Sequence, residues 1–224
     1  MSLYLIDPVF ENIEAEISWS AGFTSIYENI ARACGETAAE RPADGREPDL
    51  ALASLLRSLD LPREGLLFDC RVGEVMSWPS PSYRLMHRAS LHTYQPFVFS
   101  HLGGVEFAHA LAMAEAMAGS SELPASVCTL TFIDAADLGR KVPVSSGIGC
   151  VRLSAAIPSA SGTVWRLDAC ELDGGGKKLD AAAGNIDGGL RHLAASEKSG
   201  CDQLSIELDG AQGMRARVAI SRIQ

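Results

Sequence analysis

The chain is short of positive charge, with 19 lysines and arginines against 28 aspartates and glutamates and a net charge of −9. Nucleic-acid binding needs a basic surface, so this balance argues against it. It also argues against an electrostatic membrane anchor, and an acidic carrier protein would need a local basic patch on which to dock. Arg84, His87, Arg88 and His92 could supply such a patch, although a solvated face is the simpler interpretation.

Targeting and membrane-spanning signals are also missing. The opening residues, MSLYLIDPVFENIEAE, carry no basic segment and become acidic early, unlike a secretory signal. The apolar run at 103–118 is too short to span a bilayer and carries Glu106, His109 and Glu115. We therefore expect a protein that does not enter the membrane and that resides in the cytoplasm.

Paired cysteines and the common cofactor motifs are absent too. Six cysteines are present, but none forms a C-x-x-C pair or a zinc-type spacing. Four of them lie in apolar, strand-like runs: Cys70, Cys128, Cys150 and Cys170. Free cysteine in such runs is commonly a small buried hydrophobe. There is no G-x-S-x-G elbow, G-x-G-x-x-G fingerprint or complete phosphate-binding loop. We predict no metal and no cofactor.

What the chain does have is enough apolar sequence, 47% of 224 residues, for one full core. Hydrophobic spacing predicts helices over 23–34 and 48–59, and a short helix near 83–87. It predicts strands over 3–6, 65–72, 126–133, 148–156 and 163–172. Alternating residues around the Asp-Gly-Ala-Gln-Gly loop at 209–213 predict a C-terminal hairpin. The class is therefore α/β with mixed strand pairing.

The segment from Gln95 to Ala118 is the most informative. A strand at Phe97–Phe99 is followed by Ser100, His101 and two glycines, and then by an apolar helix expected to run from Gly103 to Ala118. The first N–H groups of a helix have no partner within it and favour an anion. A buried helix that begins just beyond a strand end is therefore a common place for chemistry.

The order of elements over about residues 48–156 resembles the N-terminal half of the thiolase superfamily, as found in β-ketoacyl synthases. The pieces that match are the helix GVEFAHALAMAEAMAGSS, the strand SVCTLTFIDAAD and the turn SSGIGCVRLSA, with Gly147 and Gly149 at the turn's glycines. The resemblance implies a single thiolase-like half over residues 1–224, with a mixed sheet covered by helices and a C-terminal β-hairpin.

In that family a cysteine nucleophile stands at the start of the buried helix. Here an ungapped match puts Gly104 at that position, and a match on the small residues puts His101 there. The histidines that activate the cysteine come from the family's C-terminal half, and this chain ends at Gln224, about where that half would begin. The resemblance is therefore to a degenerate member without the active-site cysteine.

Two pairs of residues remain as candidates for a site. Ser100 and His101 are the catalytic candidates, and their alternative roles are a helix-capping serine and a packed histidine. Glu106 and His109 form an E-x-x-H pair, but the helical-bundle metal sites that use this motif need two copies of it. An internal pair or a contact with a partner subunit is the simpler interpretation. Since the family's helix lies near a dimer interface, Gly104, Glu106 and His109 are interface candidates.

The leading hypothesis is a non-catalytic partner or scaffold of a ketosynthase in fatty-acid or polyketide-type biosynthesis. A thiolase-like half would leave one face uncovered, which favours a homodimer or a heterodimer with a ketosynthase-type protein. An acyl carrier protein or acyl-CoA is a further expected partner. The alternatives are an acyltransferase or hydrolase that uses Ser100 and His101, and an acyl-ligand-binding or structural module.

Overall fold

The computed structural model describes residues 2–15, 48–72, 81–100, 102–120, 123–133, 144–157, 162–173, 190–210 and 213–223. The described strands are β1 (Tyr4–Ala15), β2 (Gly65–Val72), β3 (Tyr94–Ser100), β4 (Ser126–Ile133), β5 (Val144–Ser154), β6 (Val164–Asp173), β7 (Gln203–Asp209) and β8 (Arg215–Arg222). The described helices are α2 (Pro48–Ser58), α3 (Pro81–Ala89), α4 (Glu106–Gly119) and α5 (Leu190–Ser199). None of these helices is long and apolar enough to cross a membrane.

The strands form one mixed sheet in the order β3-β2-β4-β5-β1-β6-β8-β7. β2 runs parallel to both β3 and β4, and the remaining neighbours are antiparallel. The predicted α/β class with mixed pairing and the C-terminal hairpin of β7 and β8 are confirmed.

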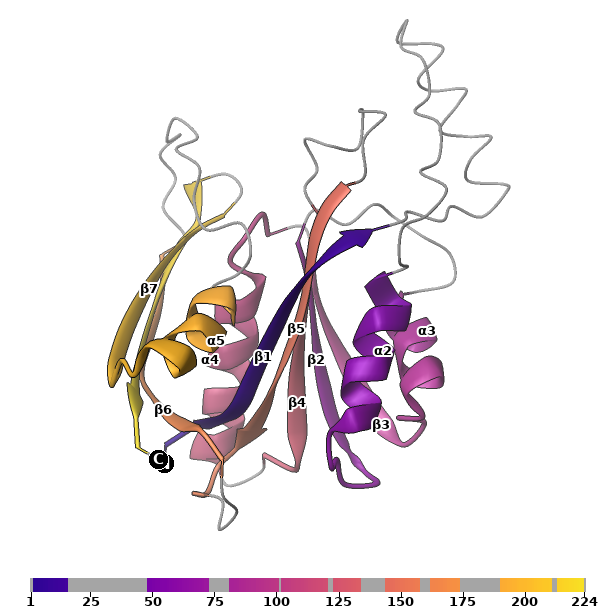
Figure 1. Cartoon of the computed structure of the whole chain (residues 1–224). Helices are drawn as coiled ribbons and strands as arrows, with labels where there is room; N and C mark the ends of the chain where they lie inside the picture. Colours follow the sequence, from indigo (N-terminus) through magenta and orange to yellow (C-terminus); the bar gives the residue numbers. More distant parts are fainter. Residues whose placement is uncertain are drawn as a thin grey trace, which may run out of the picture.

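Helices cover both faces of this sheet. α2 and α3 pack on one face through a core that includes Leu52, Leu56 and Leu85. α4 and α5 lie on the other face, and strands β6, β8 and β7 curl around them, as Figure 1 shows. The larger core therefore encloses α4 between residues of β2 and β4 on one side and residues of β6 and β8 on the other.

The outer face of the curled strands is polar. Arg217 pairs with Glu207 and Arg215 with Asp209 across β8 and β7, and all four side chains are at least half exposed. Among the described residues, β6 and β8 pack over α4 and turn this polar face outward. The expected uncovered apolar face and the partner that would bind it stay predictions.

The apolar strands β2 and β4 have the predicted bounds, whereas β1 is longer than predicted. Asp7 has a positive φ of 49° and the pairing of β1 with β5 shifts its register between Ile6 and Val9. This bulge interrupts the alternation of side chains, so the sequence pattern stops at Ile6 although the strand continues to Ala15. The predicted helix at 23–34 lies outside the described residues.

The Gly-x-Gly segment is a strand rather than the predicted turn. Gly147 and Gly149 belong to β5 and pair with Asn12 and Phe10 of β1. A Cβ atom on Gly147 would lie 2.3 Å from the Phe10 ring, and one on Gly149 would lie 2.6 Å from Leu190. The glycines are needed because Phe10 and α5 pack directly on this part of the strand.

Candidate functional site

The candidate site is the start of α4, just after the end of β3. The Glu106 carboxylate accepts hydrogen bonds from three consecutive backbone N–H groups: Leu102 at 2.8 Å, Gly103 at 2.9 Å and Gly104 at 2.7 Å. Glu106 is completely buried. The N–H groups therefore form an anion-binding nest, and a side chain of the same segment occupies it.

The two glycines make this geometry possible. Gly103 has a φ of 74° and Gly104 a φ of 128°, values that side-chain-bearing residues rarely adopt. They turn the chain so that successive N–H groups point inward at one place. α4 consequently begins at Glu106 and not at Gly103 as predicted. Its N-cap residue, Val105, makes no side-chain capping bond, so Glu106 supplies the negative charge at the positive end of the helix.

The structure places the other predicted residues around this nest. Ser100 is the last residue of β3 and half-buried, and its side chain makes no hydrogen bond to a described residue. His101 lies outside the described residues, so the catalytic pairing of Ser100 and His101 stays a prediction. Gly104 is buried within the nest and His109 is half-buried on α4. Of the three interface candidates, only His109 has side-chain surface to offer a partner.

Glu106 and His109 do not form the internal pair that was considered. In the described part of the chain the carboxylate is bonded to backbone N–H groups and not to the imidazole. Among the same residues, no group of three or more histidine, cysteine or acidic side chains could hold a metal ion.

Cysteines near α4 are packed as hydrophobes. Cys70 and Cys128 are completely buried on neighbouring strands, with their sulfur atoms 3.8 Å apart. Burial, followed by the neighbouring Cys128 thiol and the charges of Asp69 and Glu106, raises the pKa of Cys70 well above its usual value. A nucleophilic cysteine needs the opposite environment, one that favours the thiolate. Cys70 is therefore unsuited to replace the missing nucleophile.

Comparison with known proteins gives a fold but no close relative. Neither a protein-family model nor a curated protein sequence matches the chain. Among solved structures, a mutant of CsyB matches with a TM-score of 0.64 at 9% identity, covering 100% of each chain. The acyltransferase ChlB3 matches at 0.63 and 12% identity, covering 100% of this chain and 98% of its own. A variant of Xanthomonas campestris OleA with bound cerulenin matches at 0.66 and 8% identity, covering 99% and 97%.

The chain has a thiolase-like fold. Its architecture is similar to that of synthase and acyltransferase enzymes, at sequence identities that support the fold alone. The family resemblance locates a nucleophile at the start of the helix that corresponds to α4. In this chain the same place holds the nest of Leu102, Gly103 and Gly104 with the Glu106 carboxylate inside it.

A second buried polar cluster in this thiolase-like fold lies beneath α2 and α3. The Asp69 carboxylate of β2 accepts hydrogen bonds from Arg71 at 2.8 Å, Ser82 at 2.5 Å and Thr129 at 3.1 Å. Arg71 also donates to Asp49 at 2.9 Å. Asp49 accepts a further bond, at 2.7 Å, from Arg84, which was a candidate for the basic patch. The cluster joins both helices to the sheet, and Arg84 is an ion-pair partner instead of a free cation.

Sequence reasoning missed this cluster, although a signal was present. Asp69 and Arg71 stand two apart in an otherwise apolar strand, GLLFDCRV, so both side chains must point to the same face. Opposite charges on one face of a buried strand indicate a buried ion pair. For Glu106, the signal was an acidic residue shortly after two consecutive glycines.

Because the Cys150 thiol is buried, the folded protein is expected to lose stability at alkaline pH. Burial is the main cause that raises the pKa of Cys150 to about 12. In the unfolded chain this thiol ionises near pH 8.5, so between that pH and 12 the unfolded state alone loses the proton. The contribution of this thiol to stability is complete below about pH 8.5 and falls as the pH rises, with a maximum loss of roughly 5 kcal/mol. Urea unfolding at pH 7, 9 and 10 measures the slope.

Two variants distinguish the contribution of Cys150 to this pH dependence from that of other groups that titrate in the same range. Cys150→Ala is expected to reduce the slope, whereas Cys201→Ala, at a half-buried thiol, is expected to retain it. An unchanged slope in Cys150→Ala would contradict the assignment.

Proposed function

We propose that this chain is a non-catalytic thiolase-like protein that acts as a partner or scaffold of a ketosynthase-type enzyme. The observation that carries the proposal is the Glu106 carboxylate inside the nest at the start of α4. Acyl transfer through this helix end requires its N–H groups to stabilise a thiolate or an oxyanion. Here all three nest N–H groups already donate to a buried carboxylate of the same chain.

The Glu106 carboxylate is expected to bind the nest N–H groups more favourably than a substrate oxyanion. The carboxylate is two to four residues from its donors, so it binds them at little entropic cost. An incoming oxyanion would have to displace a buried charge that has no other hydrogen-bond partner among the described residues. Leaving a charge buried and unpaired costs several kcal/mol. This arrangement supports a structural role for the helix end.

The proposed partner surface is the free edge of β3. β3 lies at one end of the sheet with β2 as its neighbour among the described strands, and its sequence YQPFVFS contains no charge. Val98 on this strand is 50% exposed. The opposite edge, β7, carries Glu207 and Asp209. Charged residues on an edge strand disfavour its pairing with a strand of another chain. We therefore expect β3 to pair with a partner strand more readily than β7.

An uncharged edge suits a two-fold partner with the same kind of strand. Two copies of β3 can pair antiparallel about a two-fold axis, which makes the contact self-complementary. Pro96 is compatible with this position because proline is tolerated on edge strands. We therefore propose a homodimer, or a heterodimer with a ketosynthase-type protein that presents an equivalent edge.

Val98→Lys is expected to abolish this assembly, because it places a charge in the middle of the open edge. Sedimentation velocity of the wild-type chain, alone and with candidate ketosynthases, is expected to show a complex that the variant does not form. Leu172→Lys is the matched control, since Leu172 is 42% exposed on β6, away from this edge. A wild-type chain that stays monomeric with every candidate, or a complex unaffected by Val98→Lys, would contradict the proposal.

Acyl transfer by Ser100 and His101 is the second candidate function. It is supported by the structural similarity to the acyltransferase ChlB3 and to an OleA variant with bound lauroyl-CoA. Under this alternative the Ser100 hydroxyl would attack the thioester of an acyl-CoA or an acyl carrier protein, with His101 taking its proton, to form a serine ester as the C–S bond breaks and the thiol leaves. The two proposals differ in whether a covalent acyl adduct forms.

A further inference from the structure

A separate cleft lies at the other end of the strands from Glu106. Its volume is about 640 Å³, and its walls come from the last turn of α2, the turn at 59–64, and the segment 89–93 that links α3 to β3. β2 and β3 both begin beside it, whereas α4 begins beyond the end of β3. The volume is within the range of about 300–1,000 Å³ that is typical of small-molecule sites.

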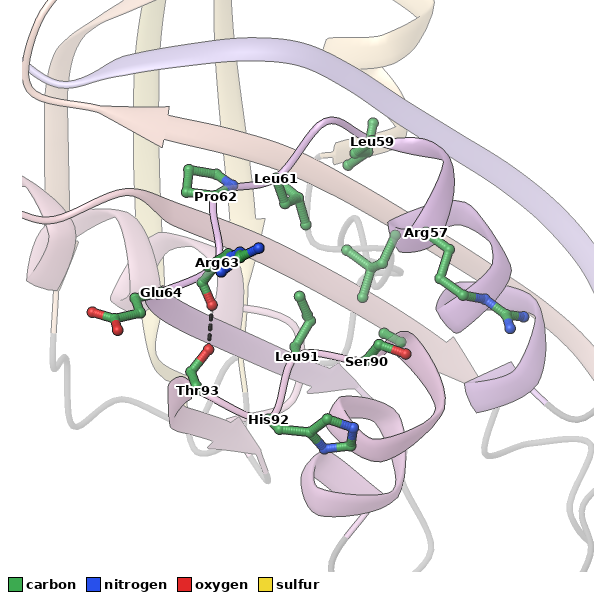
Figure 2. A pocket seen from close by; sticks show the side chains of 12 residues that line it. Arg57, Leu59, Leu61, Pro62, Arg63, Glu64, Ser90, Leu91, His92 and Thr93 are labelled. Carbon is green, nitrogen blue, oxygen red and sulfur yellow. Dashed lines mark hydrogen bonds between the residues drawn. The ribbon is translucent and has the colours of Figure 1, made fainter.

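Leucine side chains form the floor of the cleft. Leu56 is 1% exposed and Leu91 is 7% exposed, and the half-buried Leu59 and Leu61 pack against the same core. Figure 2 shows Leu61 and Leu91 pointing into the space between the two turns. This floor suits an unbranched apolar chain, whose burial contributes roughly 0.8 kcal/mol for each CH₂ group.

Basic residues outnumber acidic ones at the rim. Arg57, Arg63 and His92 line the cleft, with Glu64 as the acidic residue of the lining. Neither arginine forms an ion pair with a described residue. In Figure 2, Arg57 and His92 lie on the side of the cleft away from Glu64. A chain with a net charge of −9 thus presents a local cationic rim above an apolar floor.

Hydrogen bonds hold the two turns that form the cleft. The Thr93 hydroxyl donates to the Arg63 carbonyl, and the Tyr94 hydroxyl donates to the Pro62 carbonyl at 3.0 Å. The Leu91 N–H donates to the Met86 carbonyl at 2.9 Å. Ser90 adopts a φ of 61°, a strained value for a residue with a side chain. The cleft is therefore preformed, which reduces the entropic cost of binding.

We propose that this cleft binds a small anionic amphiphile, a medium-chain fatty carboxylate, with its carboxylate at the rim that carries Arg57 and Arg63 and its chain over Leu61 and Leu91. Both features are needed: the leucines supply apolar area, and the guanidinium groups select the anionic head. The site lies at the other end of the strands from the α4 nest and next to the start of β3.

Titration with decanoate tests the site, followed by calorimetry and by the amide NMR signals of residues 90–93. Saturable binding with a dissociation constant below about 1 mM is expected, with shifts confined to the cleft. Decanol keeps the chain but lacks the charge, and acetate keeps the charge but lacks the chain, so both are expected to bind at least about tenfold more weakly.

Two matched double variants then distinguish direct binding by Arg57 and Arg63 from an effect of the protein's net charge. Arg57→Gln with Arg63→Gln is expected to weaken decanoate binding at least about tenfold. Arg215→Gln with Arg217→Gln removes the same charge from the exposed face of β8 and is expected to leave binding unchanged. Absence of saturable binding, equal binding of decanol, or equal effects of the two double variants would each overturn the proposal.

Discussion

Replacing Glu106 with alanine is expected to destabilise the protein by roughly 3–5 kcal/mol. Three backbone N–H groups lose a charged acceptor whose side chain is completely buried, since Glu106 is 0% exposed. Hydrogen bonds to charged groups contribute about 1.5–3 kcal/mol each, and three that share one carboxylate add incompletely. Because whole domains are stable by only about 5–15 kcal/mol, the loss should be visible as a large drop in the urea midpoint.

Glu115→Ala is the matched control on the same helix. Glu115 is half-buried and its side chain makes no hydrogen bond to a described residue, so a change within about 0.5 kcal/mol is expected. Formate or acetate should partly restore the stability of Glu106→Ala, because a small carboxylate can enter the vacated nest. A Glu106→Ala protein that is as stable as the wild type would show that the nest does not need an anion.

Replacing Asp69 with alanine should cost a similar amount, about 3–5 kcal/mol, for a different reason. The change leaves Arg71 buried at 3% exposure with one partner fewer, and Ser82 and Thr129 lose their acceptor. Breaking one side of a buried ion pair is strongly destabilising because the remaining charge is uncompensated. Chemical unfolding of Asp69→Ala beside Asp168→Ala, at the exposed Arg166 pair on β6, measures the difference.

A double variant distinguishes a lost ion pair from lost packing. Asp69→Leu combined with Arg71→Met replaces both charges by apolar groups of similar size, and it should recover much of the stability that Asp69→Ala loses. Recovery would assign the cost to the uncompensated charge. A double variant that is less stable than Asp69→Ala would contradict this explanation.

Much of the fold could be predicted because its buried strands are continuous apolar runs. GLLFDCRV and SVCTLTFI have the bounds expected of them, and the loop at 209–213 marks the hairpin. The missed parts depend on tertiary structure. The bulge at Asp7 hides the second half of β1, and α5 is a largely polar segment that becomes a helix against β1.

The candidate site was predictable in its position but not in its contents. A strand, two glycines and an apolar helix indicate a helix end whose first N–H groups need an acceptor, and the structure has such a helix end there. Which anion occupies that end depends on the φ angles of Gly103 and Gly104 and on the rotamer of Glu106. Neither follows from spacing, so the E-x-x-H pattern suggested a pairing with His109 that the carboxylate does not make.

Acyl-adduct formation is the most direct test of the central claim that Glu106 fills this helix end and that the chain does not catalyse acyl transfer. The wild-type chain and Ser100→Ala are incubated with an acyl-thioester analogue and measured by intact mass. We expect no adduct on either protein, under conditions that label a catalytically active ketosynthase completely. A stoichiometric adduct on the wild-type chain that is lost in Ser100→Ala would contradict the account and establish the acyltransferase alternative.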